Sequence, residues 1–286
     1  MLSTEKAYTP EALQRFVERV HKEAQSIGID SVDFKVTPKL DGLAGRDDGR
    51  SFASRGNGEV GYEISSAFEK GVIPDGGRGL GLGEIVILTS YFNQYLAEQF
   101  EHPRNMVVGI VSSDTLNEYA RQALAEGAVR FVPYVRLPTW TGDGQTLVAG
   151  IESVMQALTG QVDYPVDGVV VEVTDERIKA HMGATAHHYR WQIAVKTKGA
   201  TATTFVENLT WQVGRTGTLT PVMEVAPVAL SGATIRRVTA HNAGLVARMQ
   251  IGPGAEVEII RSGEVIPKLE KVITPAASVD LPQHCP

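Results

Sequence analysis

A strict alternation of apolar and polar residues runs from Phe34 to Asp41. A period of two is typical of a strand with one buried face, so we predict such a strand here. The apolar parity holds Phe34, Val36, Pro38 and Leu40, and the polar parity holds Lys35, Thr37, Lys39 and Asp41. Lys39 and Asp41 are then same-face neighbours, roughly 6–7 Å apart along the strand. A lone K-x-D-G is also typical of an ordinary ion pair on a solvated strand, so the rest of the chain must decide between these readings.

Other periodicities predict mixed α and β structure up to residue 198. Apolar residues at helical spacing follow Thr9 and Pro10, a capping residue and a first-turn proline, and stop near Gly28. Further helices are predicted near 114–127 and 145–158, and strands at 84–88, 166–173 and 190–198. Because these elements lack a regular βαβ rhythm, we predict an α+β domain with mostly antiparallel sheets.

The pattern of predicted elements changes after Lys198, from mixed helices and strands to strands alone. Short strand-like runs, separated by glycine-bearing turns, fill the next stretch of roughly eighty residues, which predicts a small all-β barrel or sandwich. We therefore place a domain boundary near Gly199. The predicted organisation is a first domain over 1–198, a β domain over 199–275 and a tail over 276–286.

Composition narrows the class of protein. At 286 residues, with 43% hydrophobic content, the chain suits one large domain or a large and a small one. No apolar stretch reaches membrane-spanning length, and the N-terminus lacks a basic start followed by an apolar core, so we expect a cytoplasmic protein without membrane association. A single cysteine, Cys285, excludes an internal disulfide.

The net charge of −6 hides a division along the chain. The stretch from Thr174 to Lys271 holds 12 Lys and Arg against 8 Asp and Glu, which leaves 15 against 25 elsewhere. A mildly basic C-terminal half suits polyanion binding by that half alone. Ordinary surface scatter explains the same numbers equally well.

Two familiar site motifs are excluded by their spacing. The stretch GGRGLGLG (76–83) is not G-x-G-x-x-G and runs into a strand instead of a helix, so a dinucleotide loop is not expected. The histidines at 181, 187 and 188 lack the spacing of a closed metal site.

Charged side chains recur at the ends of the short predicted strands. They are Lys39, Asp41, Arg55, Glu84, Asp167, Lys196 and Lys198. Several strands that present cations and carboxylates to one cleft suit phosphoryl or nucleotidyl transfer, because cations neutralise phosphate oxygens and carboxylates hold a metal or orient a ribose. A lysine in such a place can itself attack phosphorus.

The order of these motifs resembles that of the bacterial NAD-dependent DNA ligases over nearly the whole chain. It runs KLDG, SRGNG, GEIVI, HPRN, DGVVV, RWQIAVK, QVGRTGTLTPV, VTAHN and IGPGAEVEIIRSGEVIP, and is most specific between Val166 and Pro267. The resemblance implies an ATP-grasp-like nucleotidyltransferase domain of α+β class followed by an OB-fold. It implies NAD+ and Mg²⁺ as cofactors and nicked double-stranded DNA as partner.

The resemblance also implies roles for individual residues. Lys39 would take AMP from NAD+, with Asp41 assisting and Asp167 supporting the metal. The expected AMP and NAD+ contacts are Thr37, Lys39, Leu40, Arg55, Glu84, Glu172, Arg190 and Lys196. The expected DNA contacts are Arg104, Arg215, Thr216, His241, Asn242 and Arg261, mostly to phosphate and minor groove.

The sequence departs from the family pattern at several places. Thr37 stands where the family has a glutamate that reads the adenine, Ser112 replaces an arginine, and Glu172 replaces a lysine that we expect near the AMP phosphate. A carboxylate there would repel phosphate. By the same comparison we expect the chain to lack the N-terminal helical domain that grips nicotinamide mononucleotide, and we expect Cys285 to be a lone ligand of an incomplete four-cysteine zinc module.

These departures leave the function open between two classes of protein. One is a ligase core, either truncated or divided between two polypeptides as in a compact viral genome, that needs its missing domain in trans. The other is a catalytically impaired DNA-binding subunit of a split ligase. A transferase that moves AMP to another acceptor is a third reading, which the intact QVGRTG and RSGEVIP motifs disfavour.

Overall fold

A computed structural model describes residues 2–57, 60–100, 102–196, 200–214, 217–230, 233–261, 267–279, 281–282 and 284. The chain divides into two compact units, Met1–Thr197 and Lys198–Pro286. The division falls beside the boundary expected near Gly199. Among the described helices, none is long and apolar enough to cross a membrane.

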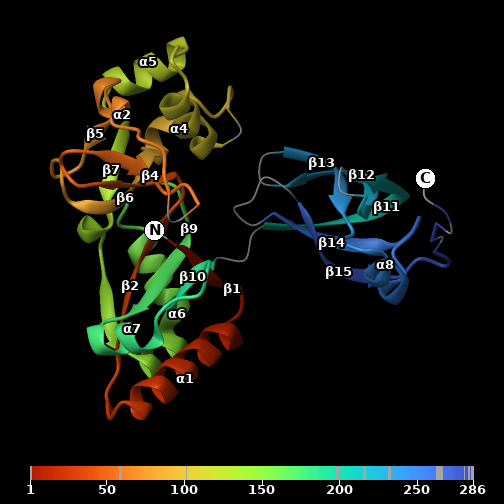
Figure 1. The fold of residues 1–286 in the computed structure, drawn as a ribbon. Coiled ribbons are helices and arrows are strands. Elements are labelled where there is room, and N and C mark those ends of the chain that lie inside the picture. The colour runs from red at the N-terminus through yellow and green to blue at the C-terminus, as the bar shows by residue number, and fades with distance from the viewer. Residues whose placement is uncertain are drawn as a thin grey trace. The chain divides into compact units, whose positions relative to one another are not determined.

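The first sheet of the first unit carries the KLDG strand near its centre. Its order is β1 (Ser3–Ala7), β10 (His188–Lys196), β9 (Val166–Val173), β2 (Asp33–Leu40) and β8 (Trp140–Asp143). Only the β1–β10 pair among these is parallel. Helices α1 (Pro10–Ser26), α6 (Gly144–Thr159) and α7 (Glu176–Met182) cover one face and share its core (Figure 1). The other face, which we call the polar face, carries Lys35, Thr37 and Lys39 of β2.

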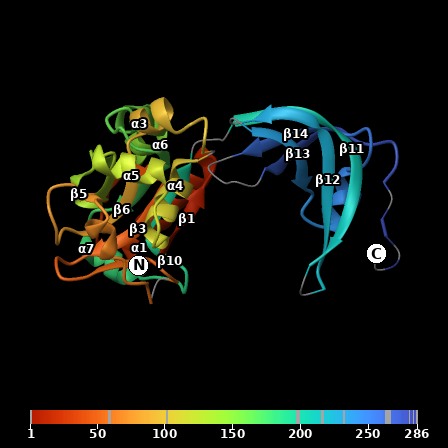
Figure 2. The same ribbon diagram turned by 90° about the horizontal axis from the view of Figure 1, so that it is seen from above.

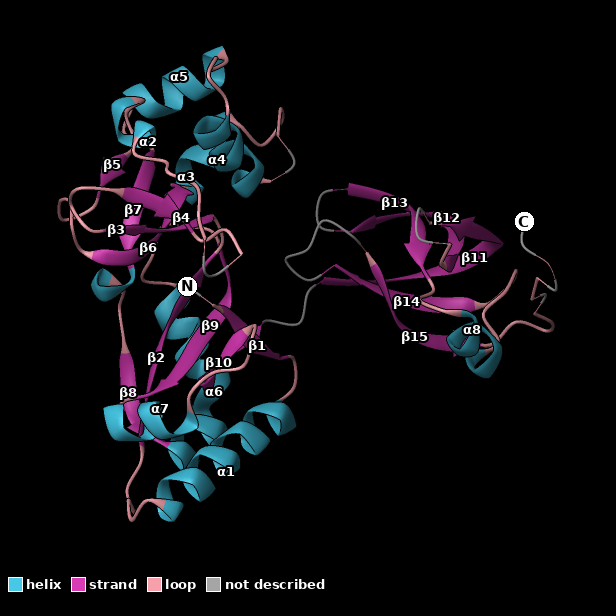
Figure 3. Ribbon diagram, viewed as in Figure 1, coloured by secondary structure: helices cyan, strands magenta, loops and turns pink. Residues whose placement is uncertain are grey.

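The second sheet of this unit has its own helices and its own core. Its order is β4 (Phe52–Ser54), β3 (Leu43–Asp47), β6 (Gly81–Ile87), β7 (Val129–Pro133) and β5 (Ile73–Pro74). The helices are α2 (Ser66–Glu69), α3 (Thr89–Tyr95), α4 (Pro103–Ser112) and α5 (Glu118–Ala125), and a 3₁₀ turn, Tyr134–Arg136, follows β7. Figure 3 shows helices gathered at the outer end of this sheet.

The predicted strand and first helix are confirmed. In β2 the apolar parity is buried and Lys35, Thr37 and Lys39 are half-buried. Helix α1 begins after Thr9, whose hydroxyl accepts a hydrogen bond from the Ala12 N–H. Helix α5 begins later than expected because the Asn117 side chain caps it at the Ala120 N–H. The periodicity did not predict β1, α3, α4 or α7.

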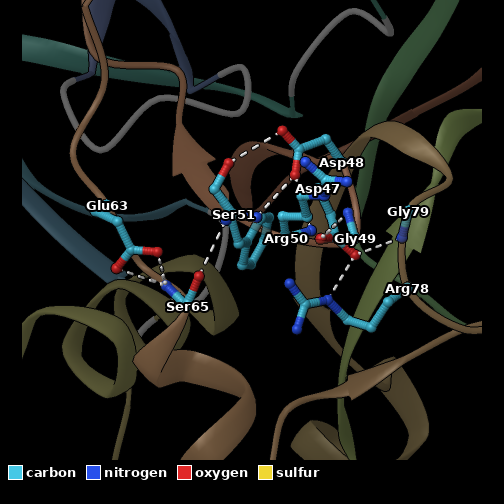
Figure 4. A network of polar contacts seen from close by, with 10 residues as sticks. Asp47, Asp48, Gly49, Arg50, Ser51, Glu63, Ser65, Arg78 and Gly79 are labelled. Atoms are coloured by element: carbon cyan, nitrogen blue, oxygen red, sulfur yellow. Dashed lines mark hydrogen bonds and ion pairs between the residues drawn. The ribbon is translucent and has the colours of Figure 1, made fainter.

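The glycine-rich stretch is part of a loop fastened by the fully buried carboxylate of Asp47 (Figure 4). Asp47 accepts hydrogen bonds from Arg78 Nε at 2.8 Å, from the Gly79 N–H at 2.9 Å and from the Gly49 N–H at 3.1 Å. The Arg78 guanidinium also lies over the Phe68 ring, 4.2 Å from its centroid. These contacts, which we call the Asp47 clasp, tie two loops together at one end of the β3–β6 pair.

The second unit is the predicted β domain and forms a closed barrel. Its order is β11 (Ala200–Val213), β12 (Leu219–Leu230), β13 (Ala233–Thr239), β15 (Lys268–Thr274) and β14 (Glu256–Arg261), with α8 (Ala243–Met249) between β13 and β14. Figure 2 shows the long curved strands β11 and β12, whose bend lets the sheet close on itself. The sequence pattern did not predict α8.

Candidate functional site

A cavity of about 530 Å³ opens on the polar face of the first sheet. It draws its lining from both sheets of the first unit, which meet around a small apolar cluster that includes Leu40 and Val86. Eight of the residues expected from the sequence line it, namely Thr37, Lys39, Leu40, Asp41, Arg55, Glu84, Arg104 and Glu172. The fold therefore gathers these residues from five separate stretches of sequence around one space large enough for a nucleotide.

Lys39, which lines the cavity, shares the Asp167 carboxylate with Lys196, and neither Asp167 nor Lys196 is among the lining residues. Lys39 Nζ lies 3.0 Å from Asp167 Oδ1, and Lys196 Nζ lies 2.7 Å from Asp167 Oδ2. The side chains of Asp167 and Lys196 are 8% and 7% exposed, whereas that of Lys39 is 25% exposed. Lys39 is thus the member of this triad that a ligand in the cavity can reach.

Gly168 explains how Asp167 comes to face the two lysines. Val169, Val171 and Val173 point into the helix-covered core, so a strict alternation would send Asp167 there too. The β2–β9 register instead shifts between Pro38 and Leu40, and Gly168 has φ 143°. A Cβ at Gly168 would lie 2.1 Å from the Val195 carbonyl oxygen, so no other residue fits this bulge.

The electrostatics of the triad favour an ionised Asp167. Burial by itself would raise the pKa of this carboxyl, but the ammonium groups of Lys39 and Lys196 outweigh burial and hold the pKa below its usual value. The carboxylate therefore compensates two cations that would otherwise repel each other in a partly dehydrated place.

Asp41 does not pair with Lys39 in this structure, although the two share a parity. Its Oδ1 lies 3.1 Å from Arg104 NH1, and its Oδ2 lies 3.5 Å from His102 Nε2. His102 Nδ1 accepts a hydrogen bond from the Arg104 N–H and caps α4. The next residue, Gly42, leaves room for a close approach, because a Cβ there would lie 2.0 Å from the Ile85 carbonyl oxygen.

Glu84 is buried and is hydrogen-bonded to a tyrosine and to the backbone next to Asp41. Its Oε2 accepts a hydrogen bond from the Tyr134 hydroxyl at 2.5 Å, and its Oε1 accepts one from the Gly42 N–H at 3.3 Å. Burial raises the pKa of Glu84 to about 7, against the lowering effect of the Tyr134 hydrogen bond and of Lys39 and Arg104. Burial and the adjacent Glu84 also raise the pKa of Tyr134 well above its usual value.

Arg190 and Glu172, both expected to contact the nucleotide, lie in positions that differ from those expected from the sequence. Arg190 is exposed on β10 and does not line the cavity. Glu172 lies opposite Lys35, four residues before Lys39 on β2, and its carboxylate is 2.6 Å from Lys35 Nζ. Its charge is therefore compensated locally, and the repulsion expected at the phosphate does not follow from its position.

The expected DNA contacts on the barrel are only partly described. Arg215, Thr216 and Cys285 lie outside the described residues, and of Arg261 only the backbone, in β14, is described. His241 is exposed and adopts φ 64°, an uncommon conformation for a residue with a side chain. The Asn242 side chain caps α8 by accepting a hydrogen bond from the Leu245 N–H at 2.9 Å.

Sequence reasoning missed Tyr134, His102 and Lys35. Lys35 shares the polar parity of β2 with Thr37 and Lys39, which was a sufficient signal for it. His102 stands in the HPRN motif, but nothing in the letters indicated a helix cap. The position of Tyr134 beside Glu84 depends on the pairing of β6 with β7, so the local sequence pattern could not predict it.

The residues present fit NAD+ and a shared Mg²⁺ site. The cavity is lined by lysine and arginine side chains and by further hydrogen-bonding groups along its length. Among the described residues no group of three His, Cys, Asp or Glu side chains is placed to hold a metal. Mg²⁺ commonly binds one or two carboxylates together with substrate phosphates, and the Asp41 carboxylate, which lines the cavity, suits that sharing.

Comparison with known proteins follows the same division of the chain. Residues 203–280 match the NAD-dependent DNA ligase OB-fold domain. A protein named DNA ligase from Desulfatibacillum aliphaticivorans is 61% identical over 286 residues, and one from Psychromonas ingrahamii is 46% identical over 290. Both alignments cover 100% of this chain but only 45% and 44% of the relatives, so the chain spans less than half their length.

A solved Lig E DNA ligase aligns over 95% of this chain and 100% of its own, with 12% identity and a TM-score of 0.47. The identity to curated ligases along the whole chain and the OB-fold match show that the chain belongs to the bacterial DNA ligase family, of the NAD-dependent type.

Proposed function

We propose that this chain carries the nucleotidyl-transfer core of an NAD-dependent DNA ligase. Lys39 takes AMP from NAD+ and passes it to the 5′-phosphate of a nick. The 3′-hydroxyl of the nick then attacks that phosphate, AMP leaves, and the nick is sealed. The observation that supports this most strongly is the triad at the cavity, in which a reachable lysine shares a buried carboxylate with a second lysine.

In the first step Lys39 Nζ is the nucleophile. Its lone pair forms a bond to the α-phosphorus of NAD+, the bond from that phosphorus to the bridging oxygen breaks, and nicotinamide mononucleotide leaves with the electron pair. The Lys39 ammonium must first give its proton to water in the cavity, and Asp167 holds Nζ in place for the attack. Lys196, held on the same carboxylate, adds positive charge near Lys39 that helps to offset the charge developing on the α-phosphate.

The other cavity residues hold the nucleotide. Arg55 and Glu84 lie toward the second sheet and suit the ribose and the phosphate. Asp41, fixed by Arg104, assists the attack and the later joining step. Mg²⁺, when bound, would supply further neutralisation of phosphate charge.

The acceptor is nicked DNA. The barrel matches the ligase OB-fold family, and its described residues His241 and Asn242 are the ones we expect to approach the duplex. Such contacts go mostly to phosphate and carry little sequence information. A second ligase subunit stays an expectation from the sequence.

A paired binding and sealing assay tests this function. Wild type and Lys39→Ala are given the same nicked duplex with NAD+ and Mg²⁺. We expect both to bind the nick and the wild type alone to seal it. Equal binding with no sealing by either protein, even when an N-terminal ligase domain is added in trans, would favour the alternative of a DNA-binding subunit.

A further inference from the structure

A second charged row crosses the cavity at the end away from Lys39. Lys35 on β2, Glu172 on β9 and Gln192 on β10 lie opposite one another in the sheet register, and all three line the cavity. Lys35 precedes Lys39 by four residues, so this row lies roughly 13 Å along the strand from the nucleophile. The cavity is therefore polar at both ends.

The part of the cavity wall between these ends is much less polar. Thr37 and Val170 lie opposite each other in the register and both line the cavity. A nucleotide whose phosphate contacts Lys39 would place its flat base over this middle row. The edge of the base would then meet the row formed by Lys35 and Glu172.

The Lys35–Glu172 pair offers a hydrogen-bond donor beside an acceptor. The two groups are 2.6 Å apart, and their side chains are 40% and 20% exposed. Adenine presents the complementary pair on one edge, with the amino group at C6 as donor and N1 as acceptor. Because the proposed function supplies an adenine nucleotide to this cavity, we infer that Glu172 accepts from the adenine amino group and Lys35 donates to N1.

A second lysine lies near Glu172 but outside the lining of the cavity. Lys179, on α7, lies 3.9 Å from the Glu172 carboxylate and 4.9 Å from the centroid of the Trp191 ring, and it does not line the cavity. The closer partner of Lys179 is Glu176, whose carboxylate is 2.8 Å from Lys179 Nζ, so Lys179 is a lysine beside the pair that takes no part in contacting the base. The pair acts as a specificity determinant for the base, while the chemistry stays at Lys39.

Equilibrium binding of free nucleotides tests this inference. AMP and IMP are titrated separately into wild type, Glu172→Gln, Lys35→Met and the control Lys179→Met, with calorimetry as readout. Hypoxanthine in IMP carries an acceptor at C6 and a donor at N1, the reverse of adenine. We expect the wild type to bind AMP at least about tenfold more tightly than IMP, as a well-placed pair of hydrogen bonds discriminates between bases.

The variants separate base reading from a structural ion pair. The amide of Glu172→Gln can present either polarity, so the AMP preference should fall to within about threefold, and Lys35→Met should lose the preference too. Lys179→Met, which removes the same charge behind the cavity, should keep it. A preference unchanged in Glu172→Gln and Lys35→Met, or a wild type that prefers neither nucleotide or binds neither, would overturn the inference.

Failure of the inference and failure of the proposed function give different results. Binding of AMP and IMP forms no bond to Lys39. A protein that discriminates AMP from IMP but never accepts AMP on Lys39 would refute the transfer reaction and leave base reading intact. A protein that accepts AMP on Lys39 but does not discriminate AMP from IMP would refute base reading and leave the transfer reaction intact.

Discussion

Lys39 Nζ lies 3.0 Å from Asp167 Oδ1, although the two residues are 128 positions apart in the sequence. The contact joins the strand that carries KLDG to the strand that carries DGVVV. Lys196, on β10 at the other side of β9, contacts the second oxygen of the same Asp167 carboxylate. The proposed reaction therefore depends on three neighbouring strands being held in one register.

Replacing Asp167 with Asn should destabilise the protein strongly. Lys39 and Lys196 would then face each other without a carboxylate between them, and breaking a buried ion pair from one side costs about 3–5 kcal/mol. Denaturant unfolding measures this. The double variant Asp167→Leu/Lys196→Met should recover a large part of the loss, because no buried charge is left unpaired.

The matched control is an ion pair on the barrel surface. Lys271 Nζ lies 3.2 Å from Glu258, and the lysine side chain is 59% exposed. Glu258→Gln should change the free energy of unfolding by no more than about 1 kcal/mol. An Asp167→Asn effect as small as that would mean that the triad is not a buried, coupled unit.

The raised pKa of Glu84 predicts a pH dependence of stability. A carboxyl with a pKa of about 7 in the folded state and near 4.5 when unfolded keeps its proton only in the folded state between these values. The free energy of unfolding should therefore fall as pH rises from 4.5 to 7, by up to about 3 kcal/mol, and level off above 7.

The variant Glu84→Gln isolates this contribution. Its glutamine cannot ionise, so the difference between wild type and variant should grow across the same pH range. Chemical denaturation at several pH values from 4.5 to 8 measures both profiles. Parallel profiles would show that Glu84 titrates normally.

The Asp47 clasp predicts a pH dependence opposite to that of Glu84, because here the free energy of unfolding should fall as the pH becomes acidic. Burial alone would raise the pKa of Asp47, but Arg78 and the Gly79 and Gly49 N–H groups hold it below its usual value. The stabilisation is then complete above the unfolded pKa near 4 and is lost as pH falls toward the lower folded pKa. Asp47→Asn should cost about 1.5–3 kcal/mol at pH 7 and less at pH 3. A cost that does not change with pH would contradict a charged clasp.

Asn242 allows helix capping to be separated from DNA binding. Asn242→Ala removes the cap of α8 and should lower the stability of the barrel by about 1 kcal/mol. Asn242→Asp keeps the cap but adds a negative charge, so it should preserve stability and weaken binding of nicked duplex. Thermal unfolding and duplex titration at fixed salt measure the two effects. Unchanged duplex affinity in Asn242→Asp would remove this residue from the expected DNA contacts.

The strands were predictable from sequence because their period of two is strong. Strand β2 shows the expected buried parity, and the barrel follows from closely spaced strands and turns. Helix α4 was missed because a histidine caps it and Gly109 interrupts its pattern. The short edge strand β1 has too few residues to show a period.

The members of the site were easier to predict than their partners. Lys39, Asp41 and Glu84 do line one cavity. Their pairing depends on sheet register and on bulges, which local patterns do not reveal. Gly168 turns Asp167 toward the lysines, and Glu172 meets Lys35 only because β2 and β9 are adjacent.

The central claim is that Lys39 accepts AMP. The most direct measurement is the intact mass of the protein before and after incubation with NAD+ and Mg²⁺, beside Lys39→Ala, with peptide mapping of any adduct. The account predicts a gain of one AMP, located on Lys39, in the wild type alone. No adduct in the wild type, even with an N-terminal ligase domain supplied in trans, or an equal adduct in Lys39→Ala, would contradict it.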